Sequence, residues 1–164
     1  MPFDAFMKIA TVPGESTDDK HKTWIELLSY HWGASQATGG SASMTGAHTG
    51  QRVDIQDFSM VHQLDKASPK LFQACCTGEH ISDVTVELCK AGGDKQKYMT
   101  YKMTDVIVSS VRPGGSTGGG DALPLEEVSF RFSKVTLEYI PIDKTGKPQG
   151  QVPAGWDLAQ NKKV

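Results

Sequence analysis

Residues 126–142 read EEVSFRFSKVTLEYIPI, and this stretch decides the fold. Apolar and polar side chains alternate along it, which is the period of a β-strand with one buried face. The apolar positions form two sets of opposite parity, Val128, Phe130 and Phe132 followed by Val135, Leu137 and Tyr139. A strand that changes parity midway carries a bulge or passes from one sheet to another. The stretch therefore predicts a long, bent strand in a strongly coiled or closed sheet.

Alternating patterns of the same kind extend over most of the chain. They lie at residues 6–12, 22–32, 51–64, 81–90 and 97–111. Parity also changes within one of them, between Ile55 and Phe58. So many strand patterns beside a single helical one favour a mainly β fold. We expect a small β-barrel of two packed antiparallel sheets with one short flanking α-helix.

The helical pattern covers residues 69–77. Ser68 can cap its N-terminus, Pro69 suits its first turn, and Gly78 can end it. The apolar side chains recur at helical spacing and are predicted to form one face against the sheet, Leu71, Phe72, Cys75 and Cys76. A helix this short depends on such packing, because isolated short helices are unstable in water.

Length and charge limit the class of protein. The chain has 164 residues, a net charge of −2 and a sequence pI of about 6.2. This length fits a single domain, residues 1–164, which can bury a core without help from a metal or a disulfide. The slightly acidic balance provides no strong positive field to attract nucleic acid or anionic lipid.

The cysteines and the N-terminus indicate where the protein folds. Cys75, Cys76 and Cys89 are odd in number and two are adjacent, which makes a poor disulfide framework. We expect reduced thiols in a protein that folds in the cytoplasm. The opening MPFDAFMKIATV lacks the basic region of a secretory signal, and no stretch reaches the ~20 apolar residues of a membrane span. We therefore expect neither a signal peptide nor membrane insertion.

Two segments stand outside the strand patterns. Residues 33–50 are rich in small and polar residues, and Met44 is the only long apolar side chain among them. We expect an extended loop there, and loops of this length are commonly functional. The polar stretch 143–164 contains Trp156. A free tail has nothing against which to bury an indole, so we expect this tail to be docked on its own domain or on a neighbouring copy.

The chain shows no convincing catalytic or cofactor motif. Residues 112–121, RPGGSTGGGD, are Gly-rich, but Asp121 follows the last Gly where a phosphate loop needs Lys and Ser or Thr. The five histidines form no HExxH motif, and the cysteines lack CxxC spacing. We predict no catalytic residue, no cofactor and no metal site. A zinc site built from distant histidines and a Cys–His nucleophile pair stay open as minor alternatives.

An alternative function rests on residues 95–102, KQKYMTYK, in which aromatic and basic side chains interleave. Tyr98 and Lys102 would share one strand face, and Tyr101 would lie on the other. Proteins that bind single-stranded nucleic acid use such faces, although half-buried strand aromatics explain the pattern equally well. The alternative interpretation is therefore an oligonucleotide-binding β-barrel module.

Three segments together resemble a known family. They are LDKASPKLFQACCTGEHI at 64–81, SFRFSKVTLEYIPID at 129–143 and GWDLAQNKKV at 155–164. The combination is similar to Hcp, the haemolysin-coregulated protein of the bacterial type VI secretion system, over essentially the whole chain. The resemblance implies a two-sheet β-barrel whose copies form six-membered rings, stacked into a hollow tube like that of a phage tail. It also implies secretion through the same apparatus, and it implies neither an enzyme nor a cofactor.

The resemblance also implies partners and contact residues. The partners would be other copies of the chain, a contractile sheath, a spike protein at the tube tip and effector cargo in the lumen. Neither nucleic acid nor a membrane would be a partner. The loop at 33–50 would correspond to the extended loop of the family, which contacts neighbouring subunits and rings. The expected interface residues lie in or beside this loop and in the tail, namely Met44, Thr45, His48, Thr49, Gln51, Trp156, Asp157 and Leu158.

Overall fold

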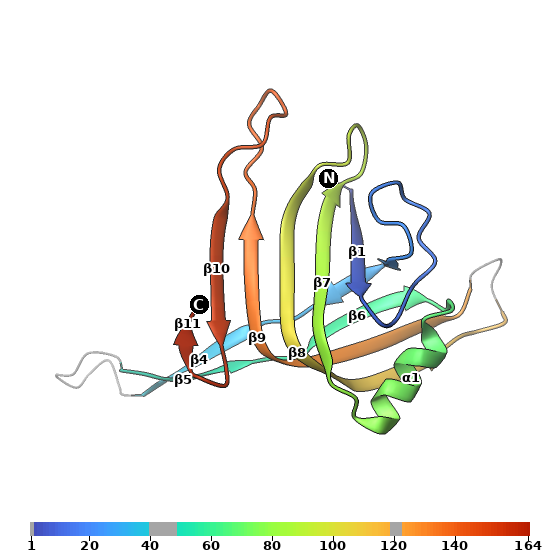
Figure 1. The fold of residues 1–164 in the computed structure, drawn as a ribbon, viewed down its shortest axis with the longest axis horizontal. Helices are drawn as coiled ribbons and strands as arrows, with labels where there is room; N and C mark the ends of the chain where they lie inside the picture. Colours follow the sequence, from blue (N-terminus) through green and yellow to red (C-terminus); the bar gives the residue numbers. More distant parts are fainter. Residues whose placement is uncertain (1, 40–48, 119–122) are drawn as a thin grey trace.

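The computed structural model describes residues 2–39, 49–118 and 123–164, and it consists mainly of β-strands around one short helix (Figure 1). The strands are β1 Phe3–Ile9, β2 Ile25–Leu27, β3 Ser29–His31, β4 Ala34–Gly39, β5 Thr49–Ile55, β6 Phe58–Gln63, β7 Ile81–Lys90, β8 Lys97–Gly114, β9 Leu125–Tyr139, β10 Val152–Asp157 and β11 Lys162–Lys163. The helix, α1, is Ser68–Thr77. In the described part of the chain, no helix is long and apolar enough to cross a membrane.

The long strand β9 joins the two halves of the main sheet. Its first part, Leu125–Phe130, pairs with β6, and its second part, Lys134–Tyr139, pairs with β10. β8 lies along its other edge from end to end, and all of these pairings are antiparallel. β9 therefore changes its partner between Phe130 and Lys134, where the sequence predicts a change of parity. Figure 1 shows β8 and β9 bending together through this region.

Within the described residues, the main sheet has nine strands and is not closed by a ladder. Its principal order is β11-β10-β9-β8-β7-β1-β2, while β6 pairs with β9 and β3 pairs with β6. The chain passes from β2 to β3 through Leu28, whose amide donates to the carbonyl of Val61 at 2.8 Å. The two halves are thus connected there by chain continuity. The prediction of a mainly β fold with one short helix is confirmed, whereas the sheets do not form a closed barrel.

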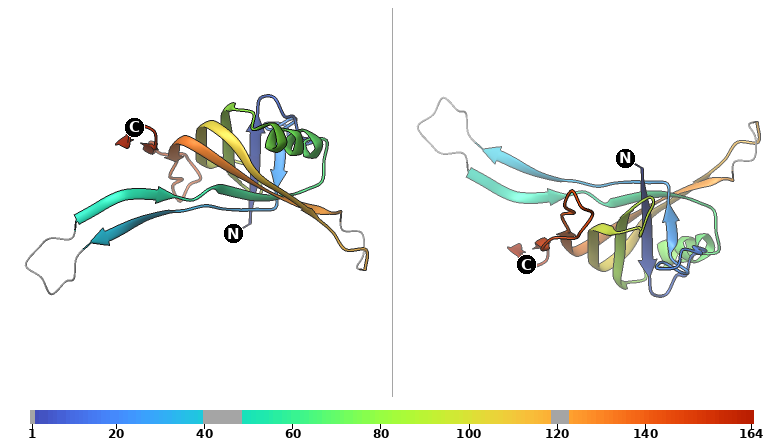
Figure 2. Two further views of the ribbon diagram at one scale, coloured as in Figure 1. Left: turned by 90° about the horizontal axis from the view of Figure 1, so that it is seen from below. Right: turned by 90° about the horizontal axis from the view of Figure 1, so that it is seen from above.

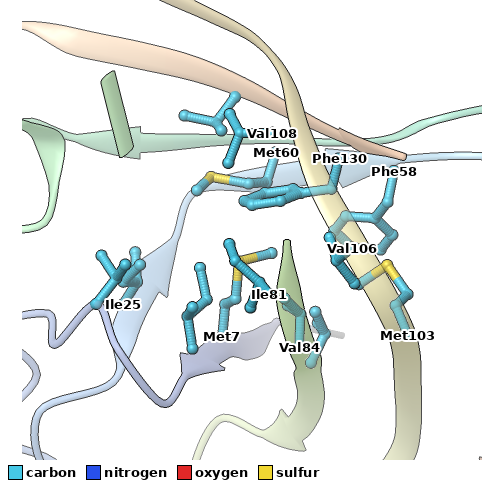
Figure 3. Close-up of a cluster of buried hydrophobic side chains, with 14 of the residues drawn as sticks. Met7, Ile25, Phe58, Met60, Ile81, Val84, Met103, Val106, Val108 and Phe130 are labelled. Carbon is cyan, nitrogen blue, oxygen red and sulfur yellow. The ribbon is translucent and has the colours of Figure 1, made fainter. Parts of the chain in front are cut away.

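The core fills the space between the two halves of the sheet (Figure 3). Three methionines from different strands, Met7, Met60 and Met103, are completely buried there. They pack with the aromatic rings of Phe58 and Phe130, which are also buried. Methionine suits this position because its unbranched side chain fills irregular gaps between surfaces that curve differently.

The helix packs against β8 through a narrower face than the sequence suggests. Ala67, Leu71 and Ala74 are buried, while the ring of Phe72 is 60 % exposed and Cys76 is exposed. The predicted apolar face was therefore wrong for these last two residues. Ala67 and Ala74, on either side of Leu71, are small and let the helix approach the sheet closely. The buried face is therefore turned away from Phe72 and Cys76.

The helix termini also differ from the prediction at one end. Ala67 is the N-cap and makes no side-chain cap, and the hydroxyl of Ser68 instead accepts a hydrogen bond from the amide of Asp65 at 3.2 Å. At the other end Gly78 adopts a left-handed conformation with φ of 68°, and its amide donates to the carbonyl of Ala74 at 3.0 Å. Glycine adopts this conformation without steric cost.

Residues 33–50 are not simply a loop. β4 and β5 form a separate two-stranded antiparallel sheet, with Ala34 opposite Ile55 and Gly39 opposite Thr49. The prediction of a loop over the whole range was therefore wrong for residues 34–39 and 49–50, and residues 40–48 lie outside the described part. Small polar residues carry no apolar alternation, so the strand pattern was not visible in the sequence.

Candidate functional site

The β4–β5 hairpin, which we call the arm, extends away from the main body (Figure 2). At its base, the amide of Gln56 donates to the carbonyl of Gly33 at 2.8 Å, which joins the two strands of the arm to each other. Arg52 Nη2 attaches the arm to the body by donating to the carbonyl of Leu158 at 3.2 Å. Isolated two-stranded hairpins are only marginally stable in water. The arm therefore has the form of an element that gains stability by lying on another surface.

A groove separates the arm from the body. Its volume is about 530 Å³, and we call it the Trp156 groove. The side chains from the arm and from β9 and β10 that face it are mainly apolar. Its lining consists of Trp32, Ala34, Gln36, Gln51, Val53, Ile55, Val135, Leu137, Ala154, Gly155, Trp156 and Asn161. An apolar groove between a projecting element and a sheet is typical of a surface that another protein segment covers.

The strand β10 brings Trp156 to this groove. Trp156 lies opposite Val135 of β9, and its side chain is half-buried. The indole Nε1 is buried and has no hydrogen-bond partner among the described residues. The preceding Gly155 allows β10 to lie close to β9, because a Cβ there would stand 3.1 Å from the carbonyl oxygen of Val135. The tail is thus held by strand pairing, with one polar atom of its indole left unsatisfied.

The residues after Trp156 turn back and hold the end of β10 in place. Asp157 Oδ1 accepts a hydrogen bond from the amide of Gln160 at 2.9 Å, and the amide of Leu158 donates to the carbonyl of Ser133 at 2.8 Å. Leu158 is partly buried against the core and lines a second pocket of about 330 Å³ on the side of Arg131. These two residues therefore stabilise the turn, and the Trp156 groove does not include them.

The structure brings two of the predicted interface residues together. Gln51 and Trp156 both line the Trp156 groove, the first from the arm and the second from the body. The backbone carbonyl of Gln51 accepts a hydrogen bond from Gln36 Nε2 across the hairpin. Thr49 is in β5, paired with Gly39. The remaining predicted residues of the arm, Met44, Thr45 and His48, lie outside the described residues.

A charged cluster that the sequence analysis did not detect surrounds His21. The Nδ1 atom of His21 is 2.8 Å from Asp18 Oδ2, and its Nε2 atom is 2.7 Å from Glu87 Oε2. Lys95 Nζ pairs with Asp18 Oδ1 at 2.8 Å and, with His21, holds the pKa of that carboxyl at about 2. The partners are 66 and 77 residues apart in the sequence, so only the tertiary fold brings them together.

A second buried histidine, His62 on β6, lies opposite Glu126 of β9. Its Nε2 is 2.9 Å from Glu126 Oε1, and Asp65 Oδ2 is 3.7 Å from its Nδ1. The side chain of His62 is completely buried, and that of Glu126 is 3 % exposed. Burial alone would lower the pKa of His62, but the carboxylates of Asp65 and Glu126 outweigh it and raise that pKa. The pair links the end of β6 to the start of β9.

The structure places one cysteine beside a histidine. Cys89 Sγ is 3.9 Å from His21 Nε2. Burial, with the charges of Glu87, Asp18 and Asp4, raises the pKa of the Cys89 thiol to about 11. A nucleophilic cysteine needs the thiolate, which a raised pKa disfavours. The environment of Cys89 therefore opposes the Cys–His nucleophile pair that the sequence left open.

Tyr101 of β8 faces the protein interior. Tyr101 is buried, its ring centroid lies 5.4 Å from that of Trp32, and its hydroxyl is 3.3 Å from that of Tyr30. Burial and this hydroxyl pairing raise the pKa of Tyr30 well above its ordinary value. Tyr98 is half-buried. A ring enclosed by its own core cannot stack on a base, so the geometry does not favour the oligonucleotide-binding alternative.

Comparison with known proteins agrees with the architecture. The family described as "Type VI secretion system effector, Hcp" matches residues 6–139. The chain is 40 % identical over 163 residues to a Pseudomonas aeruginosa protein named hcp1, covering 98 % of both sequences. A solved structure of a type six secretion system protein superposes with a TM-score of 0.93 at 39 % identity, covering 99 % of this chain and all of the other.

A second solved structure gives the same result. Hcp1 from Salmonella typhimurium superposes with a TM-score of 0.82 at 36 % identity, and the whole of both chains is covered. The matches extend over the arm, β9 and the C-terminal strands, which are the elements that form the candidate surface. The full-length agreement in sequence and fold establishes that this chain belongs to the Hcp family of type VI secretion system proteins.

Proposed function

We propose that this chain is a structural subunit of the type VI secretion inner tube. Six copies form a ring, the rings stack into a hollow conduit, and the lumen carries effector proteins. A contractile sheath and a tip spike are the other partners. The protein folds in the bacterial cytoplasm and leaves through the apparatus it helps to build. Membership of the Hcp family supports this role.

One observation carries the assembly proposal, the combination of the arm with the Trp156 groove. The arm extends from the body, and the groove beside it is open and largely apolar. A ring needs heterologous contacts, in which one surface of a subunit meets a different surface of the next. The projecting hairpin and the apolar groove between its base and the body provide two such non-identical surfaces on one chain.

A non-enzymatic role agrees with the chemistry of the described residues. The side chains of His80, Asp105 and Ser133 are of the types found in a catalytic triad, but here the aspartate lies in the centre. His80 Nδ1 and Ser133 Oγ are each 2.8 Å from an oxygen of Asp105. The histidine therefore cannot activate the serine. The environment of Cys89 opposes a thiolate, as described above. Any activity delivered during secretion would then belong to the cargo.

The decisive experiment measures the mass of the assembly. Light scattering after size-exclusion chromatography should give about six times the 17.8 kDa of one chain, and negative-stain images should show rings. Val53→Asp introduces a charge into the apolar side of the arm at the groove, so it should shift the protein to smaller species while the circular dichroism spectrum stays unchanged.

The matched control is Phe72→Asp, which adds the same charge to an exposed apolar residue on the outer face of α1. This variant should retain the ring mass. A wild-type protein that stays monomeric at high concentration contradicts the proposed function. If Val53→Asp and Phe72→Asp reduce the ring fraction equally, the proposal that the arm takes part in assembly is wrong.

A further inference from the structure

A second buried cluster lies apart from the main core, on the outer face of β1 and β7. Residues 13–24, which we call the cover loop, connect β1 to β2 and lie beside β1 (Figure 1), and His21 of this loop reaches Glu87 of β7. Phe6 and Cys89 from the strands are buried there at 3 % and 0 % exposure, together with His21 from the loop itself at 2 %. The proposed tube function uses none of these side chains, so their burial needs a separate explanation.

Three metal-binding side chains converge in this cluster. Glu87 and Cys89 are two residues apart on β7, which places both on the same face of the strand. His21 Nε2 from the cover loop lies 2.7 Å from Glu87 Oε2 and 3.9 Å from Cys89 Sγ. All three ligand atoms lie within 4.8 Å of one another. One ion could therefore contact all three.

The His21 ring is held in the orientation that a metal ligand requires. Its second nitrogen, Nδ1, faces Asp18 Oδ2 at 2.8 Å, and its ring stacks on Phe6 at 4.1 Å and meets Trp24 edge-on at 4.7 Å. Histidines that bind metals commonly donate their other ring N–H to a carboxylate, which fixes the tautomer and points the free nitrogen at the ion. Asp18 is in turn held by Lys95 at 2.8 Å.

We propose that His21, Glu87 and Cys89 form a zinc site that fastens the cover loop to β7. A thiolate, an imidazole and a carboxylate together suit Zn²⁺, whereas Mg²⁺ and Ca²⁺ prefer oxygen ligands alone. The three side chains leave a fourth position for water. On binding, Cys89 Sγ and the hydrogen bond between His21 Nε2 and Glu87 Oε2 each release one proton to solvent, and the ion takes the place of these protons. Coordination to Zn²⁺ deprotonates a thiol that its surroundings alone would keep neutral.

The distances require only a small adjustment. With ordinary zinc bond lengths, a tetrahedral site places sulfur and nitrogen ~3.5 Å apart and nitrogen and oxygen ~3.4 Å apart. The present distances are 3.9 Å for Sγ to Nε2 and 2.7 Å for Oε2 to Nε2. Glu87 can make the outward movement because its side chain is 18 % exposed, and its other oxygen stays 3.5 Å from Lys97 Nζ.

The test titrates the intact, metal-free protein with ZnCl₂ in the presence of a chromophoric chelator. The wild-type protein should take up one Zn²⁺ per subunit, and thermal unfolding should shift to higher temperature as zinc is added. Cobalt added in place of zinc should give the absorption of a thiolate–Co²⁺ bond. Uptake is counted per subunit, so the result does not depend on whether rings form.

Two variants remove ligands, and two matched variants leave the site intact. Cys89→Ala and Glu87→Gln should each weaken zinc binding at least tenfold and abolish the thermal shift. Cys76→Ala, an exposed cysteine, and His80→Gln, an exposed histidine, should bind zinc as the wild type does. The Glu87→Gln side chain can still hydrogen-bond to His21, so this variant tests the site even if Cys89→Ala fails to fold. Absence of stoichiometric uptake, or unchanged uptake in Glu87→Gln, overturns the proposal.

Discussion

His62 shows what a single buried side chain contributes to this fold. It is surrounded by two carboxylates on neighbouring elements, Glu126 on β9 and Asp65 in the turn before α1. Buried charges are tolerated only when they are paired. The protonated ring satisfies Glu126 and lies near Asp65, so protonation and the closure of this turn are linked.

This linkage predicts the pH dependence of stability. The folded protein raises the pKa of His62 above the 6.5 of an ordinary histidine, because the effect of the two carboxylates exceeds that of burial. The stabilisation is therefore fully present below the unfolded pKa and is lost as pH rises through the folded pKa. The urea midpoint of unfolding should fall as pH increases above about 6.5.

His62→Gln should reduce this slope, because glutamine can hydrogen-bond to Glu126 but does not titrate. The matched change His80→Gln removes a histidine that is 67 % exposed and should leave the slope as it is. A urea midpoint of unfolding that rises with pH in the wild-type protein would contradict the raised pKa of His62.

At the level of residues, the sequence is informative where a side chain is out of place locally. An indole in a polar tail needs a surface, which is why Trp156 predicts a docked tail, and in the structure its strand pairs with β9. His21 gave no such signal, since its partner Glu87 lies 66 residues away. Sequence spacing reveals clusters formed within one helix or strand, and this cluster forms only when the cover loop folds over β7.

At the level of elements, the cover loop depends on a close approach at Gly14. The amide of Gly14 donates to the carbonyl of Thr23 at 2.7 Å, and a Cβ at Gly14 would stand 2.5 Å from the carbonyl oxygen of Trp24. Gly14→Ala should therefore lower the free energy of unfolding by about 1–3 kcal/mol, as other overpacking substitutions do.

Gly150→Ala is the matched control, because nothing lies within 4 Å of the added Cβ. It should leave stability within about 0.5 kcal/mol of the wild type, as surface substitutions commonly do. Chemical denaturation of both variants provides the measurement. Equal midpoints for the two variants would mean that the cover loop moves away from β2 at little cost.

The elements predicted from sequence were those with apolar alternation. The parity change within residues 126–142 indicated the bend in β9, because each half of the strand buries its side chains against a different part of the sheet. β4 has no such pattern, since its side chains are small and polar, so the sequence predicts a loop there. The helix was located, but its buried face was not, because the small alanines that face the sheet carry little hydrophobic signal.

For the whole molecule, Trp156 should affect the subunit and the assembly together. Trp156→Ala removes an indole that is half-buried in the subunit and lines the groove, so it should cost about 1–3 kcal/mol of stability and reduce the ring fraction. Trp156→Phe keeps most of the apolar area and removes the unpaired Nε1, so it should cost less than about 1 kcal/mol.

Thermal unfolding and light scattering on the same samples separate the two effects. Trp156→Phe should assemble nearly as well as the wild type. If Trp156→Ala changes neither the melting temperature nor the mass, β10 does not need its indole and the groove is not an assembly surface.

The shared strand β9 has a mechanical consequence for the proposed tube subunit, which a contractile sheath would drive forward. It is bonded along one edge to β8 and along the other to β6 and then β10. A force along β9 therefore loads these ladders in shear, so that many hydrogen bonds must break together. The arm has a single ladder of its own, and a pull at its open end would break those bonds one after another. Under load, the body should hold its shape while the arm is the first part to give way.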